Sequence, residues 1–140
     1  MGLNYVLASG SSYRRILLER LKIKFEIRKP NIDESQRPCE SPEELVHRLS
    51  KEKAWAVLKG PEDLIIGSDQ LAVHNGNIEG KPLTRQNNIE QLKRFSGQSV
   101  VFLTGLYVLK SDNLRCKKRI VRTEIKFRKL LDWDIETYVA

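Results

Sequence analysis

Short apolar runs alternate with amphipathic segments along this chain, and the alternation predicts an α/β protein. Apolar runs rich in β-branched residues are typical of strands, whereas apolar positions three or four residues apart are typical of helices. We expect strands at residues 5–8, 25–27, 64–66, 100–103, 106–109 and 119–130. We expect helices at about 13–21, at 42–58, at 85–95 and from 132 onward.

Capping and turn residues indicate where these elements begin and end. Ser41 and Pro42 are typical of an N-cap and a first helical position, and Glu44 completes a capping box. The Asn-Gly pair at 75–76 predicts the tip of a hairpin over 73–78, with Gly105 later interrupting the strand region at 100–109.

Composition narrows the class of protein. With 140 residues, the chain fits one domain with a hydrophobic core. Cys39 and Cys116 are far apart and form no C-x-x-C pair, which argues against a zinc site or a disulfide framework. Apolar runs stay far below the roughly 18 residues of a membrane span, and the first residues lack a signal-peptide layout. We therefore expect a cytoplasmic protein that does not contact a membrane.

The basic charge lies mainly in one region. The net charge is +7, and much of the excess lies between residues 115 and 129. If this region is a strand, its basic residues alternate with Thr123, Ile125 and Phe127 and occupy a solvated face. We favour this interpretation over nucleic-acid binding, because no RRM, KH or helix-turn-helix signature accompanies the charge.

A carboxylate follows the expected strand at 64–66. Gly67 is expected to close this strand, so that Asp69 lies just past its carboxyl end, where open α/β sheets usually bind ligands. A short turn then returns the chain to Lys81. A possible base or metal ligand paired with a cation suits phosphate chemistry.

A second candidate segment joins the first strand to the first helix. Residues 9–15 supply small residues, free backbone N–H groups at a helix start, and the guanidinium groups of Arg14 and Arg15. Such a segment can bind an anion. The alternative interpretation is a capped amphipathic helix that carries two solvated arginines.

Two further positions leave alternatives open. Lys53 lies on the apolar stripe of its predicted helix, where it either snorkels past the core edge or points its ammonium into a site. Asp33 and Glu34 are adjacent acids in a loop, and they are either solvated turn residues or carboxylate ligands for Mg²⁺.

Taken together and in order, these motifs resemble Maf-like nucleoside triphosphate pyrophosphatases. The resemblance rests on residues 7–15, 33–34, 52–54, 67–70 and 80–82, and so extends over essentially the whole chain. Tyr13, Gln70 and the context 32–35 resemble the branch of the family that acts on 7-methyl-GTP.

The resemblance implies a fold and a reaction. The implied fold is α/β, like that of inosine triphosphatases, with an elongated mixed β-sheet, flanking helices and a cleft between two lobes. The implied reaction cleaves a nucleoside triphosphate between its α and β phosphates, releasing a monophosphate and pyrophosphate in the removal of modified nucleotides.

The resemblance also implies roles for individual residues. Asp69 is the expected proton acceptor that activates water, and Glu34 and Asp69 are the expected ligands of a divalent cation, Mg²⁺ or Mn²⁺. Tyr13 and Gln70 are expected to determine base specificity. The residues expected around the phosphates are Ser9, Arg14, Arg15, Lys53 and Lys81.

The chain departs from the family at two places. Ser12 replaces the usual proline, which matters little at the start of a helix. The last expected helix is short, with Asp132 as its N-cap and Ile135, Tyr138 and Val139 as its apolar residues. Family members continue beyond this helix. We therefore expect residues 1–140 to be a Maf-like domain that is incomplete at its carboxyl end.

The incomplete end leaves alternatives. The chain is either an active pyrophosphatase or a catalytically impaired nucleotide-binding remnant, and a small basic RNA-binding protein is a weaker third reading. An unpaired strand edge and uncovered apolar surface also predict a homodimer, because both promote association.

Overall fold

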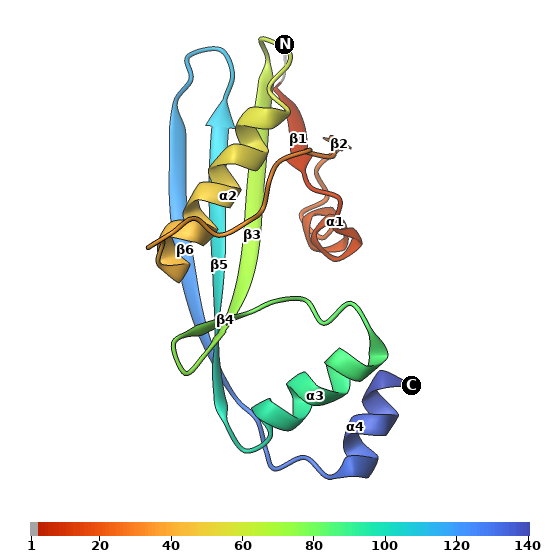
Figure 1. The fold of residues 1–140 in the computed structure, drawn as a ribbon. Helices are drawn as coiled ribbons and strands as arrows, with labels where there is room; N and C mark the ends of the chain where they lie inside the picture. The colour runs from red at the N-terminus through yellow and green to blue at the C-terminus, as the bar shows by residue number, and fades with distance from the viewer. Residues whose placement is uncertain (1–2) are drawn as a thin grey trace. The chain divides into compact units, whose positions relative to one another are not determined.

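The computed structural model describes residues 3–140, and within them strands and helices alternate as the sequence predicts (Figure 1). The strands are β1 (Asn4–Ala8), β2 (Phe25–Ile27), β3 (Asp63–His74), β4 (Asn77–Glu79), β5 (Ser99–Lys110) and β6 (Cys116–Lys126). The helices are α1 (Ser12–Glu19), α2 (Pro42–Ala56), α3 (Arg85–Phe95) and α4 (Asp132–Val139). In this described part of the chain, no helix is long and apolar enough to cross a membrane.

The strands form one mixed sheet in the order β2-β1-β3-β5-β6, and β4 pairs with β3 outside this path. β1 runs parallel to both of its neighbours, with Val6 opposite Ile65 of β3. β3 and β4 are antiparallel. Because β1 lies between β2 and β3, the right-handed crossovers through α1 and α2 place these helices on opposite faces of the sheet.

The chain divides into two compact units. The described residues up to Gln70, together with Thr104–Val121, form the first unit, which contains β1, β2, α1 and α2. The second unit consists of Leu71–Leu103 and Arg122–Ala140, and it contains β4, α3 and α4.

The core of the first unit lies between α2 and one face of the sheet (Figure 1). Apolar side chains from α2 and its C-cap residue, β1, β3 and β5 form one buried cluster: Val6, Ala8, Ala54, Val57, Ile65, Tyr107 and Leu109. The turn of α2 that carries Ala54 is thereby pressed against β3, which determines where the neighbouring polar residues of that helix lie.

Glycines allow this close approach, and two predictions about them are wrong. Gly67 was expected to close a strand and Gly105 to interrupt one, yet β3 and β5 are each continuous over 12 residues. A Cβ atom at Gly67 would lie 3.0 Å from the Cβ of Ala54, and one at Gly105 would lie 2.7 Å from the carbonyl oxygen of Val46. Both glycines are therefore required by helix packing.

Gly105→Ala is expected to lower the free energy of unfolding by about 1–3 kcal/mol, because the added methyl group overpacks the contact between helix and sheet. Gly80→Ala is the matched control, since a Cβ there meets nothing within 4 Å. Urea unfolding of both variants tests the expectation. Equal midpoints for the two would contradict it.

Predicted helix starts are confirmed where the capping interaction is local. Ser41 Oγ accepts a hydrogen bond from the Glu44 N–H at 3.1 Å, and Pro42 is the first helical residue. Thr84 Oγ1 accepts a hydrogen bond from the Asn87 N–H at 3.1 Å. Each cap satisfies a backbone donor that the first turn of a helix cannot pair.

The predicted hairpin is also confirmed. Val73 of β3 pairs with Ile78 of β4, and the turn between the strands contains Asn75 and Gly76. These two residues have φ values of 51° and 78°, as a type I′ turn requires.

The start of α4 differs from the prediction. Asp132 was expected to be the N-cap, but it is the first helical residue, and Leu131 occupies the N-cap position. The Asp134 carboxylate accepts a hydrogen bond from the Leu131 N–H at 2.9 Å, and so performs the capping. Of the predicted apolar residues, Ile135 is buried whereas Tyr138 is 76% exposed.

β6 differs in both extent and burial. It covers Cys116–Lys126 instead of residues 119–130, and every one of its residues is exposed. Ile125 is 42% exposed as well, so β6 has no buried face. Phe127 follows the strand and packs against Phe95, with ring centroids 5.4 Å apart. The basic residues are solvated, as we expected.

Candidate functional site

Asp69 lies inside β3, which corrects the prediction that it follows the strand's carboxyl end. The strand continues to His74 because Gly67 does not terminate it. Side chains two residues apart in a strand share a face, so Asp69 faces α2 just as the packed position of Gly67 does. Asp69 is only 7% exposed, so its carboxylate is held within the protein.

Lys53 of α2 connects the acidic residues. Its Nζ atom donates to Asp69 Oδ1 at 3.0 Å and forms an ion pair with Glu34 Oε1 at 3.0 Å. Leu45 and Leu49 of the same helical stripe are buried against the sheet, which brings this lysine inward. The structure therefore supports the interpretation that the ammonium points into a site.

One oxygen of the Asp69 carboxylate remains available. Within residues 3–140, the buried atom Asp69 Oδ2 accepts no hydrogen bond. A buried acceptor without a partner costs about 1–3 kcal/mol, so such atoms call for an explanation. An oxygen that receives a proton from water or coordinates a cation would need this availability.

The structure distinguishes the two loop acids. Asp33 Oδ1 accepts hydrogen bonds from the Ser35 hydroxyl at 2.6 Å and from the Ser35 N–H at 2.9 Å. The hydroxyl bond, followed by the backbone bond, lowers the pKa of Asp33 from its usual value. Asp33 therefore stabilises the loop, whereas the Glu34 side chain, 60% exposed, reaches Lys53.

Ser9 and Arg14 form a second group in the same unit. Ser9 directly follows β1 and is 3% exposed. Its Oγ accepts from the Ser11 N–H at 3.0 Å and from Arg14 Nη1 at 3.4 Å. Ser11 in turn caps α1 by accepting the Arg14 N–H at 3.3 Å. Both interactions use the Ser9 oxygen as acceptor, so its hydroxyl hydrogen can donate to an anion.

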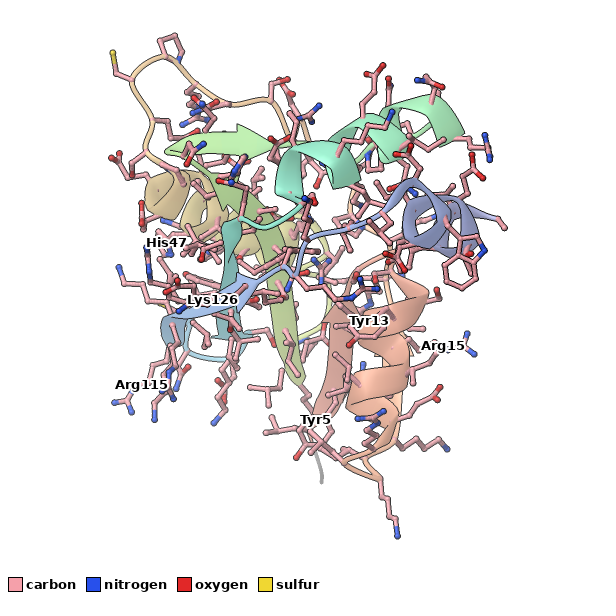
Figure 2. All side chains as sticks on the ribbon, turned by 90° about the horizontal axis from the view of Figure 1, so that it is seen from below. Tyr5, Tyr13, Arg15, His47, Arg115 and Lys126 are labelled. Atoms are coloured by element: carbon pink, nitrogen blue, oxygen red, sulfur yellow. The ribbon has the colours of Figure 1, made fainter. Side chains whose placement is uncertain are left out.

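Arg15 and Tyr13 project from α1 into solvent (Figure 2). Arg15 Nε pairs with Glu19 at 3.2 Å, and both side chains are about half exposed. The structure thus does not bring Arg15 to Ser9. An exposed pair of this spacing is worth only about 0.3–0.5 kcal/mol, so a phosphate can displace Glu19. Tyr13 is 69% exposed, which leaves its ring free to stack.

Gln70 follows Asp69 and therefore points to the opposite face of the sheet. It is exposed, and its Nε2 atom donates to Thr104 Oγ1 at 3.2 Å. This bond engages the amide nitrogen and leaves the carbonyl oxygen Oε1 as the acceptor of this exposed side chain.

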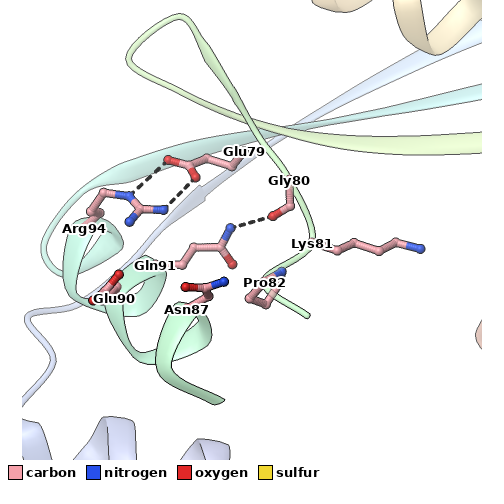
Figure 3. Close-up of a pocket in the computed structure, with 8 residues that line it drawn as sticks. All are labelled: Glu79, Gly80, Lys81, Pro82, Asn87, Glu90, Gln91 and Arg94. Atoms are coloured by element: carbon pink, nitrogen blue, oxygen red, sulfur yellow. Dashed lines mark hydrogen bonds and ion pairs between the residues drawn. The ribbon is translucent and has the colours of Figure 1, made fainter. Parts of the chain in front are cut away.

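Lys81 belongs to the second unit, whereas Asp69, Lys53 and Glu34 belong to the first. It lines a pocket of about 210 Å³ between the segment after β4 and α3 (Figure 3). Inside this pocket, Gln91 Nε2 donates to the Gly80 carbonyl oxygen at 2.9 Å. The Lys81 side chain extends away from Gln91, and its ammonium points away from the other residues that line the pocket (Figure 3).

Sequence reasoning missed one group beside the site. Arg48 of α2 forms ion pairs with Glu40 at 2.6 Å and with Glu52 at 3.2 Å. The spacing of Arg48 and Glu52, four residues apart in a predicted helix, was a readable signal. The bond to Glu40 was not readable, because it depends on how an irregular loop returns to the helix.

The carboxylates can be tested against a divalent cation. Residues 3–140 contain no group of three or more His, Cys, Asp or Glu side chains placed to hold a metal ion. Glu34 and Asp69 nevertheless converge on Lys53, and Asp69 Oδ2 lacks a partner among the described groups. Mg²⁺ is commonly bound through one or two carboxylates together with substrate phosphates, so this pair fits such an ion.

Comparison with known proteins is consistent with this chemistry. Residues 4–140 match the family of Maf-like proteins. A 7-methyl-GTP pyrophosphatase of Idiomarina loihiensis is 46% identical over 99% of this chain and 72% of its own length. A 7-methyl-GTP pyrophosphatase of Pseudomonas aeruginosa is 51% identical over 96% of this chain and 70% of its own length.

Solved structures with a similar fold are more distant in sequence. A HAM1 protein from Coxiella burnetii superimposes with a TM-score of 0.60 at 18% identity, covering 89% of this chain and 72% of its own. The Staphylococcus aureus Ham1 protein gives 0.58 at 15% identity, covering 88% and 71%. At these identities the likeness concerns the fold alone, and it confirms the predicted α/β class.

Proposed function

The chain belongs to the Maf-like protein family, and we propose that it is a nucleoside triphosphate pyrophosphatase acting on 7-methyl-GTP. The relatives that bear this name support the substrate. The observation that carries the chemistry is the Asp69 carboxylate, held at one oxygen by Lys53 and without a described partner at the other.

In this proposal Asp69 is the general base. Its Oδ2 atom accepts a proton from a water molecule, and the resulting hydroxide attacks the triphosphate. A new P–O bond forms, the anhydride bond between the α and β phosphates breaks, and pyrophosphate leaves. Lys53 holds Oδ1 at 3.0 Å and thereby orients Oδ2 toward the water.

Cationic and hydroxyl groups neutralise the phosphates in this reaction, because phosphoryl transfer depends mainly on positioning and charge stabilisation. The Arg14 guanidinium already donates to the Ser9 hydroxyl oxygen, which also accepts from the Ser11 N–H, so both side chains lie at one place. Arg15 joins them when phosphate displaces Glu19. A phosphate contact by Lys81 stays a prediction.

We further propose that Glu34 and Asp69 hold a divalent cation, Mg²⁺ or Mn²⁺. When bound, the cation would supply positive charge to the phosphate oxygens and so favour departure of pyrophosphate. Lys53 lies between the same two carboxylates and keeps them together before substrate arrives.

Tyr13 and Gln70 are proposed to select the base. The purine of 7-methyl-GTP carries a positive charge, and an exposed aromatic ring attracts such a cation. Gln70 Oε1 can accept a hydrogen bond from the N1–H or amino group of guanine, because the Gln70 amide nitrogen is engaged by Thr104.

A nucleotide panel tests the proposed function. The protein is incubated with Mg²⁺ and with 7-methyl-GTP, GTP, dTTP or UTP, and pyrophosphate release is followed. We expect the highest kcat/KM with 7-methyl-GTP. No release from any nucleotide, with cooperative thermal unfolding of the protein, would reject catalysis. Calorimetric nucleotide binding in that case would instead support the non-catalytic nucleotide-binding alternative.

Self-association is also proposed. β6 is the last strand in the sheet order, and its residues Ile120, Val121 and Ile125 are 39%, 45% and 42% exposed. Exposed strand edges and apolar residues promote pairing between copies. Sedimentation velocity tests this, and a monomer at every concentration would contradict it.

Free, exposed cysteines suit the proposed location in a reducing cytoplasm.

A further inference from the structure

The loop between β2 and α2 contains Glu34 but has neither helix nor strand structure over residues 28–41. Glu34 itself is 60% exposed, so packing does not fix its position. A carboxylate that must meet Lys53 from such a loop needs another group to hold the backbone. The contacts of α2 identify this group.

Arg48 ties both sides of this loop to α2. Its Nη2 atom donates to the Ser35 carbonyl oxygen at 2.8 Å, immediately after Glu34. Its Nε and Nη2 atoms donate to the two carboxylate oxygens of Glu40 at 2.6 and 2.9 Å. The side chains of Arg48 and Glu40 are 13% and 8% exposed, so the pair is largely shielded from water.

The same guanidinium also contacts the helical turn that carries Lys53. Arg48 Nη1 pairs with Glu52 Oε2 at 3.2 Å, and Glu52 directly precedes Lys53. A guanidinium group presents its donors in a rigid planar fork, so these bonds hold the loop and the helix in one geometry. An ammonium group could not make all of them at once.

This anchor persists over the physiological pH range. The hydrogen bond from Arg48 is the main cause that lowers the pKa of Glu40 to about 2. A carboxylate with a lowered pKa gives its stabilising contribution above its ordinary pKa and loses it only as the pH falls through the lowered value. Glu40 is therefore ionised at neutral pH.

We propose that Arg48 is a positioning residue that holds the Glu34 carboxylate beside Lys53 and Asp69. Its catalytic consequence rests on the proposed function, in which Glu34 binds the divalent cation. Misplacing a reacting group by about 1 Å can lower the rate by about 100-fold, so an anchor at the adjacent residue affects turnover.

Hydrogen exchange tests the anchoring independently of activity. Arg48→Gln is expected to accelerate exchange of the amides in residues 33–40 by about tenfold or more, while β3 remains protected. Arg37→Gln is the control, because Arg37 is in the same loop, is 65% exposed and pairs with Glu52 only at 3.4 Å. Unchanged exchange in the Arg48 variant would overturn the proposal.

Kinetics then test whether Arg48 acts through Glu34. Arg48→Gln is expected to lower kcat/KM by about 10- to 100-fold in the parent protein. In a Glu34→Gln background the same change should cost less than about threefold, because coupled residues are not additive. Arg48→Lys is expected to recover part of the lost kcat/KM. Arg37→Gln is expected to leave kcat/KM unchanged. If Arg48→Gln lowers kcat/KM by the same factor in the parent and in the Glu34→Gln background, Arg48 does not act through Glu34 and has a merely structural role.

The two proposals fail separately. If the parent protein hydrolyses no nucleotide, the proposed function fails, and the exchange comparison still decides whether Arg48 anchors the loop. If the parent protein is active and the exchange of the loop does not depend on Arg48, the positioning role fails alone. Thermal unfolding of each variant shows whether a loss of activity reflects loss of the fold.

Discussion

Asp69→Asn is expected to lower kcat/KM by about 10²–10⁴-fold, the usual contribution of a general base. The amide has the shape of the carboxylate, and its oxygen can still accept the hydrogen bond from Lys53. It cannot accept a proton from water at neutral pH. The fold should therefore survive while the reaction stops, because only the basic oxygen is lost.

Steady-state release of pyrophosphate measures this effect, and circular dichroism verifies the fold. Asp112→Asn is the matched control, because Asp112 is half exposed and pairs only weakly with Lys110, at 3.6 Å. We expect the control to retain full activity. An Asp69 variant within a few-fold of the parent would show that another group activates the water.

Lys53→Met is expected to have the second large effect, on stability as well as on turnover. The substitution leaves the 7% exposed Asp69 carboxylate without its cation. Removing one partner of a buried ion pair typically costs about 3–5 kcal/mol, because the remaining charge is buried and uncompensated. Glu34 loses the same ammonium as its partner, so the two acids then repel one another.

Urea unfolding of three variants tests this reasoning. Lys51→Met is the control on the same helix, because Lys51 is exposed, and its midpoint should match that of the parent. The double variant Lys53→Met/Asp69→Leu should recover much of the stability, since an apolar pair can replace a buried ion pair. If the urea midpoint of Lys53→Met equals that of the parent, the Lys53–Asp69 pair is not a buried ion pair.

Local chemistry made much of the fold readable from the sequence. The cap at Ser41 and the turn at 75–76 depend on groups within four residues of one another, and the structure confirms both. The order of strands and helices and the family resemblance are likewise properties of the sequence. The order of elements agrees with the fold, and the resemblance agrees with the match to the Maf-like family.

Long-range packing determined the rest. Gly67 looked like the end of a strand because a sequence does not show that α2 packs there, and Asp69 was consequently placed beyond β3. Lys53 allowed two interpretations until the buried stripe of α2 directed its ammonium to Asp69.

The geometry of the candidate site was therefore decided by the tertiary structure, whereas most of the residues proposed for it were named from the sequence. The anchoring role of Arg48 shows the reason. Its partners, Ser35 and Glu40, lie 13 and 8 residues away in a loop without regular structure. No periodic pattern connects such positions. Only the folded backbone brings the carbonyl and the carboxylate to one guanidinium group, where the hydrogen bonds are strong enough to hold the loop.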